Sequence, residues 1–396
     1  MRKSVESTWS LRTLGSLLTF LTSGSRGWAK YYVDDGDYFL RIQNVQDGRL
    51  SLADIAFVHA PDTKESVRTS VKVGDVLLSI TADLGRTAVV PKLSKSAYIS
   101  QHLAILRPSH EIDSRYLSAF LESPGGRQQF SRLNREGVKD GLNFTDVRSV
   151  VVPLPPLAEQ RRIAAILDKA DAIRRKRQEA IALTEELLRS TFLDMFGDPV
   201  TNPKGWETKC MGDIASFVGG GTPSRSVAAY FEGDICWATS KDMKGEVLAD
   251  TKEHITPEAV MNSATKLVPA ETILVVVKSK VLMHRLPVLV AGVPTCFGQD
   301  LKGIVPGVGI HPIYLARHMR IGQRVLLAQA RGVNTEGLTL DHLSEYKVMI
   351  PSSDDVMKFV EFENQTNQFL RKQQQYHREA DNLFHSLVQR AFRGDL

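Results

Sequence analysis

The sequence predicts an α+β fold in which two homologous globular domains are separated by a pair of long antiparallel helices, a pseudo-twofold internal repeat. Three observations predict this fold. The chain has 396 residues, whereas single hydrophobic cores rarely grow past about 250–300 residues. The sequence repeats itself at about half its length. Each copy also ends in a long run with the apolar spacing of a helix that packs along another helix.

The repeat is visible in residues that recur at an offset of about 197. The tryptophan, glycine and phenylalanine of WSLRTLGSLLTF (9–20) coincide with those of WETKCMGDIASF (206–217). Tyr116 matches Tyr314, and Gln101 matches Gln299, at nearly the same offset. Because the two glutamines recur in both copies, we interpret them as structural residues. A fixed long period of this kind indicates a duplicated structural unit.

The repeat divides the chain into four predicted segments. The first block, 1–152, contains short strand patterns, glycine turns and one helix pattern, which together are typical of an α+β domain. The second segment, 153–199, starts with a proline run and continues as one helical pattern that a Gly-Asp-Pro sequence ends. The third, 200–350, repeats the first block. The fourth, 351–396, is the second helical segment.

The two helical segments carry apolar residues at steps of three and four, which predicts a packing seam. Arg177 and Thr184 interrupt the seam of the first helix. Since both seams recur in register, we expect the helices to pair antiparallel. The alternative is two independent linker helices, each lying on its own domain. The predicted seam consists of Ile163, Ile166, Ile173, Leu187, Phe359, Phe362, Phe369 and Leu383.

Charge is concentrated on the globular blocks. The net charge of +5 divides into +4 for residues 1–152, 0 for 153–199, +2 for 200–350 and −1 for 351–396. This distribution favours polyanion binding by the blocks rather than by the helices.

The three cysteines form no CxxC pair, which predicts a reducing, cytoplasmic environment without disulfides. Arg12 interrupts the apolar N-terminal stretch, so we expect no signal peptide.

Motifs for catalysis are absent from the sequence. It contains no GxxxxGK[ST] phosphate loop and no GxGxxG dinucleotide fingerprint. The tetrad typical of amino-methyltransferases, Asn/Asp-Pro-Pro-Tyr, is also absent, and the ten histidines show neither HxH nor HExxH spacing. The Gly219-Gly-Gly-Thr-Pro stretch lacks the lysine of a phosphate loop and is expected to be a flexible loop. We therefore expect neither a catalytic site nor a metal site.

Several stretches together carry a family resemblance. The run PLPPLAEQRRI (153–163) before a long helix closely resembles the central region of specificity (S) subunits of Type I restriction–modification systems. The chain end LFHSLVQRAFRGDL (383–396) is similar to the distal region of that family. GGTPSR (220–225) and FLRIQNVQDGRL (39–50) resemble parts of its target recognition domains. The second block departs from the pattern, because it ends in VMIPSSD rather than in a second PLPP and Glu-Gln run.

The resemblance implies a non-catalytic DNA-binding subunit. Each block would be a target recognition domain that reads one half of a bipartite site in double-stranded DNA. The helices would set the unread gap and dock two methyltransferase (modification) subunits, and restriction/translocase subunits would join in the full complex. The chain itself would hold no cofactor, since S-adenosylmethionine, ATP and magnesium would belong to the partner subunits.

DNA reading requires arginine or amide side chains at base edges, and lysines at phosphates. Such residues are sought at turn edges and in loops, which a scaffold positions while they vary. The Arg174-Arg-Lys-Arg177 run is interpreted as a solvated helix face, with contact to spacer phosphates or to an acidic partner surface as the alternative. The candidate DNA-binding residues are Arg41, Gln43, Asn44, Arg86, Arg132, Asn134, Lys139, Asn143, Thr239, Ser240, Lys241, Lys244, Lys278, Arg285, Arg331 and Asn334.

Two alternative functions come from other classes. A coiled-coil scaffold that binds only proteins would show no salt-sensitive DNA affinity, alone or with its methyltransferase partners. A fused restriction–methylation enzyme with a cryptic catalytic site would transfer methyl groups without partner subunits, and the missing tetrad argues against it.

Overall fold

The computed structural model describes residues 9–46, 48–134, 141–330 and 337–396. It forms two compact units: unit 1 comprises Met1–Glu179 with Gln374–Leu396, and unit 2 comprises Ala180–Gln373. Each unit therefore contains a globular block together with one half of each long helix, whereas the sequence-based division placed the helices in segments of their own. No helix within the described ranges is long and apolar enough to cross a membrane.

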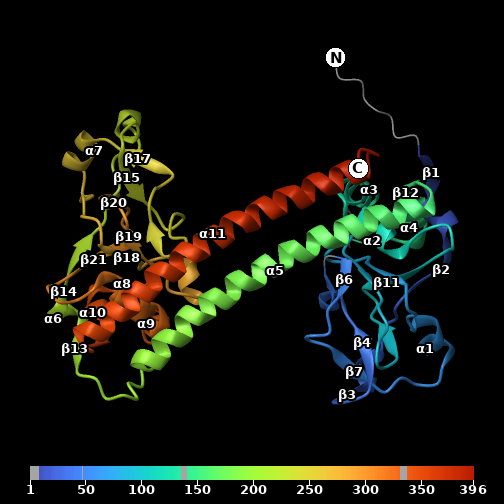
Figure 1. Cartoon of the computed structure of the whole chain (residues 1–396), viewed down its shortest axis with the longest axis horizontal. Helices are drawn as coiled ribbons and strands as arrows, with labels where there is room; N and C mark the ends of the chain where they lie inside the picture. The colour runs from blue at the N-terminus through green and yellow to red at the C-terminus, as the bar shows by residue number, and fades with distance from the viewer. Residues whose placement is uncertain (1–8, 47, 135–140, 331–336) are drawn as a thin grey trace. The chain divides into compact units, whose positions relative to one another are not determined.

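Unit 1 contains a six-stranded sheet of order β2-β11-β8-β9-β6-β5 and a four-stranded sheet of order β10-β4-β7-β3 (Figure 1). A two-stranded ribbon, β1 with β12, joins the start of the block to its end. The strands are β1 (Ser10–Thr13), β2 (Leu18–Ser23), β3 (Tyr32–Val33), β4 (Asp37–Leu40), β5 (Val45–Gln46), β6 (Gly48–Leu50), β7 (Ala56–Val58), β8 (Val76–Ser79), β9 (Thr87–Val89), β10 (Ala97–Ile99), β11 (Leu103–Pro108) and β12 (Val151–Leu154).

Short helices complete the block of unit 1. The α-helices are α1 (Lys64–Thr69), α2 (Ser114–Glu122), α3 (Pro124–Leu133) and α4 (Phe144–Ser149), and the 3-10 helices are η1 (Leu14–Leu17), η2 (Trp28–Tyr31) and η3 (Ile42–Asn44). Asp113 caps α2 by accepting from the backbone N–H groups of Arg115 and Tyr116. The core between α2 and the large sheet also takes in Ile163 and Leu167, and Val388 near the chain end. Both long helices therefore belong to the hydrophobic core of this unit.

Unit 2 repeats the arrangement with sheets of order β14-β21-β18-β19-β16 and β17-β15-β20, and a ribbon of β13 with β22. Its strands are β13 (Thr208–Cys210), β14 (Ala215–Gly219), β15 (Ile235–Ala238), β16 (Val247–Leu248), β17 (Glu253–Ile255), β18 (Ile273–Val276), β19 (Val288–Ala291), β20 (Thr295–Phe297), β21 (Leu301–Pro306) and β22 (Lys347–Met349). Its shorter helices are α6 (Met211–Ile214), η4 (Ala228–Phe231), α7 (Pro257–Met261), η5 (Lys280–Met283), α8 (Pro312–Ile321), α9 (Gln323–Ala330) and α10 (Leu340–Ser344).

The internal repeat is confirmed by matching hydrogen bonds in the two units. Tyr116 donates its hydroxyl to the carbonyl of Pro153 at 2.7 Å. Tyr314 donates to the carbonyl of Met349 at 3.0 Å. The first bond ties α2 to β12, the strand that precedes one long helix. The second ties α8 to β22, the strand that precedes the other long helix. Burial raises the pKa of both tyrosines well above the usual value, so both phenols stay protonated donors.

The two long helices are α5 (Leu157–Phe196) and α11 (Ser353–Ala391), of 40 and 39 residues. In unit 1 Arg162 donates to the carbonyl of Leu396 at 2.7 Å, and Arg177 lies over the ring of Tyr376 with 5.0 Å to its centroid. Residue numbers thus rise along one helix as they fall along the other. In unit 2 the ring of Phe359 lies 5.3 Å from that of Phe192. These contacts confirm antiparallel pairing.

The predicted seam is wrong by one residue over much of its length. Ile163 and Phe359 are fully buried, and Ile166 and Phe362 are partly buried. The other four predicted positions are about half exposed, namely Ile173 (46%), Leu187 (50%), Phe369 (49%) and Leu383 (57%). The residue after each of them is less exposed: Arg174, Leu188, Leu370 and Phe384.

The displacement has a physical cause. The prediction took the most apolar residue at each helical step. It therefore missed polar residues that have partners in the contact stripe, the row of least exposed positions along each long helix. Glu363 is buried because Arg317 donates to it at 2.8 Å. Arg174 lies over the ring of Phe384, 4.9 Å from its centroid. Thr184, treated as an interruption, is buried because its hydroxyl donates to the carbonyl of Ala180.

Candidate nucleic-acid interface

Backbone hydrogen bonds gather several loops of unit 1 at one edge of its sheets. Strands β4 and β10 are parallel, so the segments that follow them meet, and Ser100 donates to the carbonyl of Leu40 at 2.9 Å. Ile80, after β8, donates to the carbonyl of His102 at 3.0 Å, and Leu142 donates to that of Ile80 at 2.8 Å. We call this set the loop edge of unit 1: residues 41–44, 80–86, 100–102, 134 and 141–143.

Unit 2 builds the same edge with matching bonds. Gly298 donates to the carbonyl of Ala238 at 2.9 Å, Val277 to that of Asp300 at 2.9 Å, and Leu338 to that of Val277 at 2.8 Å. The loop edge of unit 2 is residues 239–244, 277–285, 298–300 and 337–338. Twelve of the sixteen candidates lie in the ranges of these two loop edges, although the ranges within each unit are far apart in sequence.

The turn after β4 shows which candidates can reach a ligand. Asn44 is 1% exposed. Its side-chain oxygen accepts from the backbone N–H of Arg41 at 2.9 Å, and its amide donates to the carbonyl of Ser51 at 3.0 Å. Asn44 is therefore a correction to the candidate set, because its polar atoms hold the turn instead of pointing to solvent. Gln43, next to it, is exposed and donates to Asp54 at 3.1 Å.

The equivalent turn of unit 2 uses Asp242. Its carboxylate accepts from the backbone N–H of Thr239 at 2.9 Å and from the Thr239 hydroxyl at 2.7 Å. The backbone N–H and the hydroxyl of Thr239 are therefore used within the turn, which corrects its assignment as a candidate DNA-binding residue. Ser240 is partly buried, and Lys241 and Lys244 are exposed on the same loop. Lys241 occupies the position that Gln43 has in unit 1.

The remaining candidates of unit 1 have different environments. Arg41 is half-buried and donates to the carbonyl of Asp54 at 3.0 Å. Arg86 pairs with Asp83 three residues earlier in the hairpin between β8 and β9. Asn143 is a helix cap, because its side chain accepts from the backbone N–H of Asp146 at 2.9 Å, and this is a third correction.

Other candidates lie beside the residues outside the described ranges. Arg132 is exposed in the last turn of α3, and Asn134 accepts from the backbone N–H of Gly141 at 3.0 Å. Lys139, Arg331 and Asn334 lie outside the described residues, so their assignments stay predictions.

Unit 2 offers more cations on its loop edge. Lys278 follows β18, and its backbone N–H donates to the carbonyl of Asp300 at 3.3 Å. Arg285 lies in the same β18–β19 connection, and both side chains are exposed. Lys280, which the sequence reasoning did not select, is exposed between them. Exposed lysines and an arginine on one set of loops suit contact with phosphates.

Sequence reasoning also missed polar residues at the β10–β11 and β20–β21 turns. In unit 1 His102 contacts its neighbour Gln101 at 3.0 Å and the hydroxyl of Thr81 at 2.6 Å, so its imidazole joins the β10–β11 turn to the β8–β9 loop. In unit 2 Gln299 is exposed at the equivalent turn. Its exposure argues against the interpretation of the repeated glutamines as purely structural. Each glutamine follows a strand that runs parallel to β4 or β15, and this pairing is visible in the fold but not in the sequence.

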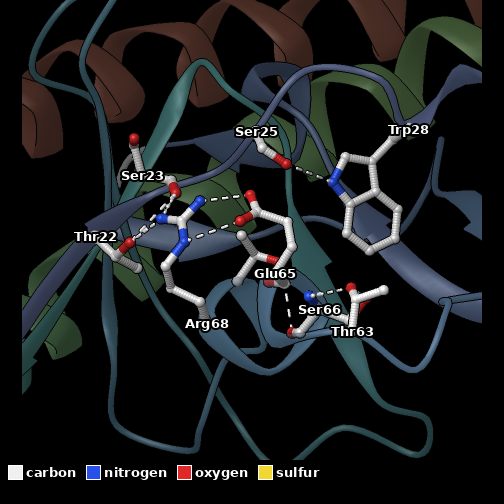
Figure 2. Close-up of polar contacts among 9 residues, drawn as sticks. Thr22, Ser23, Ser25, Trp28, Thr63, Glu65, Ser66 and Arg68 are labelled. Carbon is white, nitrogen blue, oxygen red and sulfur yellow. Dashed lines mark hydrogen bonds and ion pairs between the residues drawn. The ribbon is translucent and has the colours of Figure 1, made fainter.

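A polar cluster fixes the small sheet of unit 1 behind its loop edge. Figure 2 shows the guanidinium of Arg68 on α1 between Glu65 and the first large-sheet strand, where it donates to the hydroxyl of Thr22 and to the carbonyl of Ser23. The Arg68 guanidinium, aided by the Ser25 hydroxyl, holds the pKa of Glu65 below its usual value. Trp28 donates to Ser25 at 3.2 Å.

The same indole supports the strands that enter the loop edge. The Trp28 ring lies 5.1 Å from that of Phe39 on β4 and 5.3 Å from that of Tyr98 on β10. Aromatic pairs at these separations add to the stability gained from burial alone. The cluster therefore holds the two parallel strands whose ends present Gln43 and Gln101.

A buried histidine, His318, connects separate elements of unit 2 through hydrogen bonds. His318 accepts from the backbone N–H of Met349 through Nε2 at 3.1 Å, which leaves its Nδ1 proton for the Tyr346 hydroxyl at 3.1 Å. Tyr346 in turn donates to the carbonyl of His318 at 3.2 Å. Burial lowers the pKa of His318 to about 3, so it is neutral near pH 7. The bonds connect α8 to β22 and thereby to the start of α11.

The fold also assembles three potential metal ligands that sequence spacing did not reveal. Cys236, Asp250 and His254 each offer one donor atom, and these atoms lie within 4.8 Å of one another. Within the described ranges this is the one group of three such residues. The separation of Cys236 from the other two in sequence matches no common metal-binding motif, which is why the sequence predicted no metal site.

The fold defines a class of protein with two repeated α+β domains, each of which includes part of two long antiparallel helices. The family described as "Type I restriction modification DNA specificity domain" matches residues 6–183 and 203–375. The chain belongs to this Type I restriction–modification DNA specificity family, and it carries two target recognition domains.

Relatives agree with this assignment. The Type I restriction enzyme EcoR124I/EcoR124II specificity subunit of Escherichia coli is 31% identical over 262 residues, which cover 60% of this chain and 63% of that protein. The putative MjaX specificity subunit of Methanocaldococcus jannaschii is 24% identical over 317 residues, covering 75% and 72%. The alignment with the E. coli subunit thus spans less than two thirds of its length.

The fold matches that of the S subunit of a Type I restriction–modification system from M. genitalium. That crystal structure is 13% identical in sequence, with a TM-score of 0.65, and the match covers 99% of this chain and 98% of the other. A second structure, from work on complex assembly and conformational transition of the type I R-M system, gives a TM-score of 0.53 at 20% identity and covers both chains fully.

Proposed function

We propose that each loop edge reads one half of a bipartite site in double-stranded DNA. The observation that carries this proposal is the repeated convergence of loops: in both units the segments after two parallel strands and after the adjoining antiparallel strand are hydrogen-bonded into one edge. Such an edge places side chains from separate loops within reach of adjacent bases. The excess of positive charge on both blocks supports a polyanion as the ligand.

The two edges suit different half-sites. In unit 1 the exposed amide of Gln43 and the half-buried Arg41 lie at the turn after β4. Glutamine pairs with the adenine edge and arginine with the guanine edge in the major groove. In unit 2 the equivalent turn carries Lys241 and Lys244. Lysine acts mainly as a point charge at phosphates and at guanine, so we expect the second half-site to be different.

The paired helices are proposed to set the gap between the half-sites and to dock two methyltransferase subunits. A helix of 40 residues is about 60 Å long at about 1.5 Å per residue. Restriction/translocase subunits would join this assembly in the cytoplasm. S-adenosylmethionine, ATP and magnesium would be bound by those partner subunits, and methyl transfer to adenine would be their reaction.

Exchange of residues 1–150 for the same block of a relative with another target tests this function. The exchanged subunit is expressed with its methyltransferase partner, and methylated bases are mapped in host DNA. We expect one half-site to change while the other half-site and the gap stay the same. A change in both half-sites, or in neither, would contradict the assignment of one half-site to one block.

The protein-only scaffold makes a different prediction. Binding of a duplex that contains the mapped site should weaken steeply as salt increases, since phosphate contacts release counterions. DNA affinity that does not depend on salt, both alone and with the methyltransferase partner, would favour the scaffold.

A further inference from the structure

Three potential metal ligands meet next to the 239–244 segment of the loop edge of unit 2. Strands β15 and β17 are antiparallel, and Cys236 lies directly opposite His254 in their register. Residues that face each other in this way have side chains on the same side of the sheet. Asp250 completes the group, because its Oδ1 lies 2.8 Å from Nε2 of His254 and 3.8 Å from Sγ of Cys236.

The sulfur–oxygen and nitrogen–oxygen separations lie within an ångström of those around one tetrahedral ion. Zinc binds sulfur at about 2.3 Å, and imidazole nitrogen and carboxylate oxygen at about 2.0–2.2 Å, so tetrahedral ligands lie roughly 3.3–3.7 Å apart. The sulfur–oxygen distance of 3.8 Å is close to this range. The imidazole and the carboxylate, at 2.8 Å, need to separate by less than an ångström to admit the ion.

We propose that Cys236, Asp250 and His254 bind one divalent transition-metal ion of the zinc class, with water as the fourth ligand. The mixed donor set selects the ion: a thiolate with an imidazole favours zinc over magnesium or calcium, which prefer oxygen ligands. The thiol gives up its proton to solvent when the ion binds, and the sulfur–metal bond replaces the sulfur–hydrogen bond.

The surroundings support a ligand role for the carboxylate. The backbone N–H of Thr251 donates to Oδ1 of Asp250 at 2.9 Å. The same Oδ1 atom of Asp250 faces both other donor atoms, Nε2 of His254 and Sγ of Cys236. Cys236 is 8% exposed, and Asp250 and His254 are more open to solvent. The ion would therefore enter from the side of Asp250.

The metal would close the segment 237–249 into a loop held at both ends. That segment contains the turn made by Thr239 and Asp242, and the exposed Lys241 and Lys244. A closed loop has fewer conformations. Ordering Lys241 and Lys244 on binding would therefore cost less conformational entropy. This consequence rests on the proposed function, whereas the metal site itself does not.

The site is tested by metal titration of the full-length protein after removal of bound metal. Cobalt(II) and then competing zinc are added, and the absorption of the cobalt complex is recorded. We expect one equivalent to bind, with a thiolate-to-cobalt charge-transfer band that zinc abolishes. Absence of that band, or binding weaker than millimolar, would overturn the proposal.

Matched variants assign the ligands. Cys236→Ser and Asp250→Asn should each weaken zinc binding by at least about 100-fold, since loss even of an outer-shell partner costs about 10–100-fold. Cys296→Ser is the control, because Cys296 is buried in the same small sheet and burial raises the pKa of its thiol to about 11. Asp250 is exposed, so its variant should fold, as circular dichroism would verify. Unchanged affinity in Asp250→Asn would contradict the site.

A DNA arm separates this inference from the proposed function. With the mapped duplex, zinc should tighten binding of the wild type and should not affect Asp250→Asn. If zinc binds but leaves DNA affinity unchanged, the proposed effect on the loop is overturned. If zinc binds and the duplex does not, the half-site assignment fails while the metal site is supported.

Discussion

The side chain of Asn44 accepts a hydrogen bond from the backbone N–H of Arg41 at 2.9 Å. In unit 2 Asp242 accepts the equivalent bond from Thr239 at the same distance. Both bonds close the first turn after a strand of the small sheet. The duplicated turn therefore separates a residue that builds the loop from its exposed neighbour, Gln43 or Lys241.

This separation predicts opposite effects for adjacent residues. Asn44→Ala removes the acceptor for Arg41 and leaves the backbone groups of the turn unpaired, so it should lower the free energy of unfolding by about 1–3 kcal/mol. Gln43→Ala changes an exposed side chain and should alter stability by less than about 0.5 kcal/mol. We expect it to relax selection at one base pair of the first half-site. Urea unfolding and methylation mapping provide the two readouts, and equal loss of stability in both variants would contradict the division of roles.

The exposed cations of unit 2 predict a change in salt dependence. Lys278→Ala and Arg285→Ala should each reduce the slope of log affinity against log salt by about 0.9 if each contacts one phosphate. Lys209→Ala is the matched control, because Lys209 is exposed on β13, in the ribbon with β22 rather than on the loop edge. A slope that Lys209→Ala lowers as much as Lys278→Ala would argue against a localised phosphate contact.

The buried imidazole predicts acid sensitivity. The pKa of His318 is about 3 in the folded protein, whereas an unperturbed histidine has a pKa of about 6.5. The unfolded chain therefore binds a proton that the folded chain excludes, so stability is full above about pH 6.5 and falls as pH decreases toward 3, by up to about 1.4 kcal/mol per pH unit.

Unfolding measured between pH 4 and 6 checks this expectation. His318→Gln cannot take up the proton, so its stability should depend less on pH in this window, although its stability at pH 7 should be lower because the Tyr346 and Met349 bonds are disturbed. His284→Gln, at an exposed position, should keep the wild-type slope. Parallel slopes for wild type and His318→Gln would contradict the assignment.

The buried charged group of Arg317, Glu246 and Glu363 predicts that removal of one carboxylate lowers the free energy of unfolding strongly. Arg317 donates to Glu363 at 2.8 Å and to Glu246 at 2.9 Å, and Glu363 is 1% exposed. Glu363→Ala would leave a buried guanidinium partly unpaired, which typically costs about 3–5 kcal/mol. Glu361→Ala, on the exposed side of the same helix, should change stability by less than about 0.5 kcal/mol. Similar unfolding midpoints for the two variants would refute the role of the pair.

The repeat, the α+β blocks and both long helices were predictable because glycines, aromatic residues and helix periodicity are local signals. The contact stripe was predicted one residue too early, since Glu363 pairs with Arg317 and Arg174 packs on Phe384, partners that lie far away in sequence. Asn44 could not be distinguished from Gln43 for the same reason: both are amides in one turn, and only the fold shows which of them faces Arg41. The group of Cys236, Asp250 and His254 depends on strand register, which spacing does not encode.

The central claim, that the helices separate two independent readers, is tested by lengthening both helices. Four residues are inserted after Ala180 in α5 and four after Gln373 in α11, at the divisions between the two units. Four helical residues add about 6 Å, equivalent to about two base pairs at about 3.4 Å each. Methylation mapping of the subunit with its methyltransferase partner should return both original half-sites with a gap about two base pairs longer. An unchanged gap, or altered half-sites, would contradict the account.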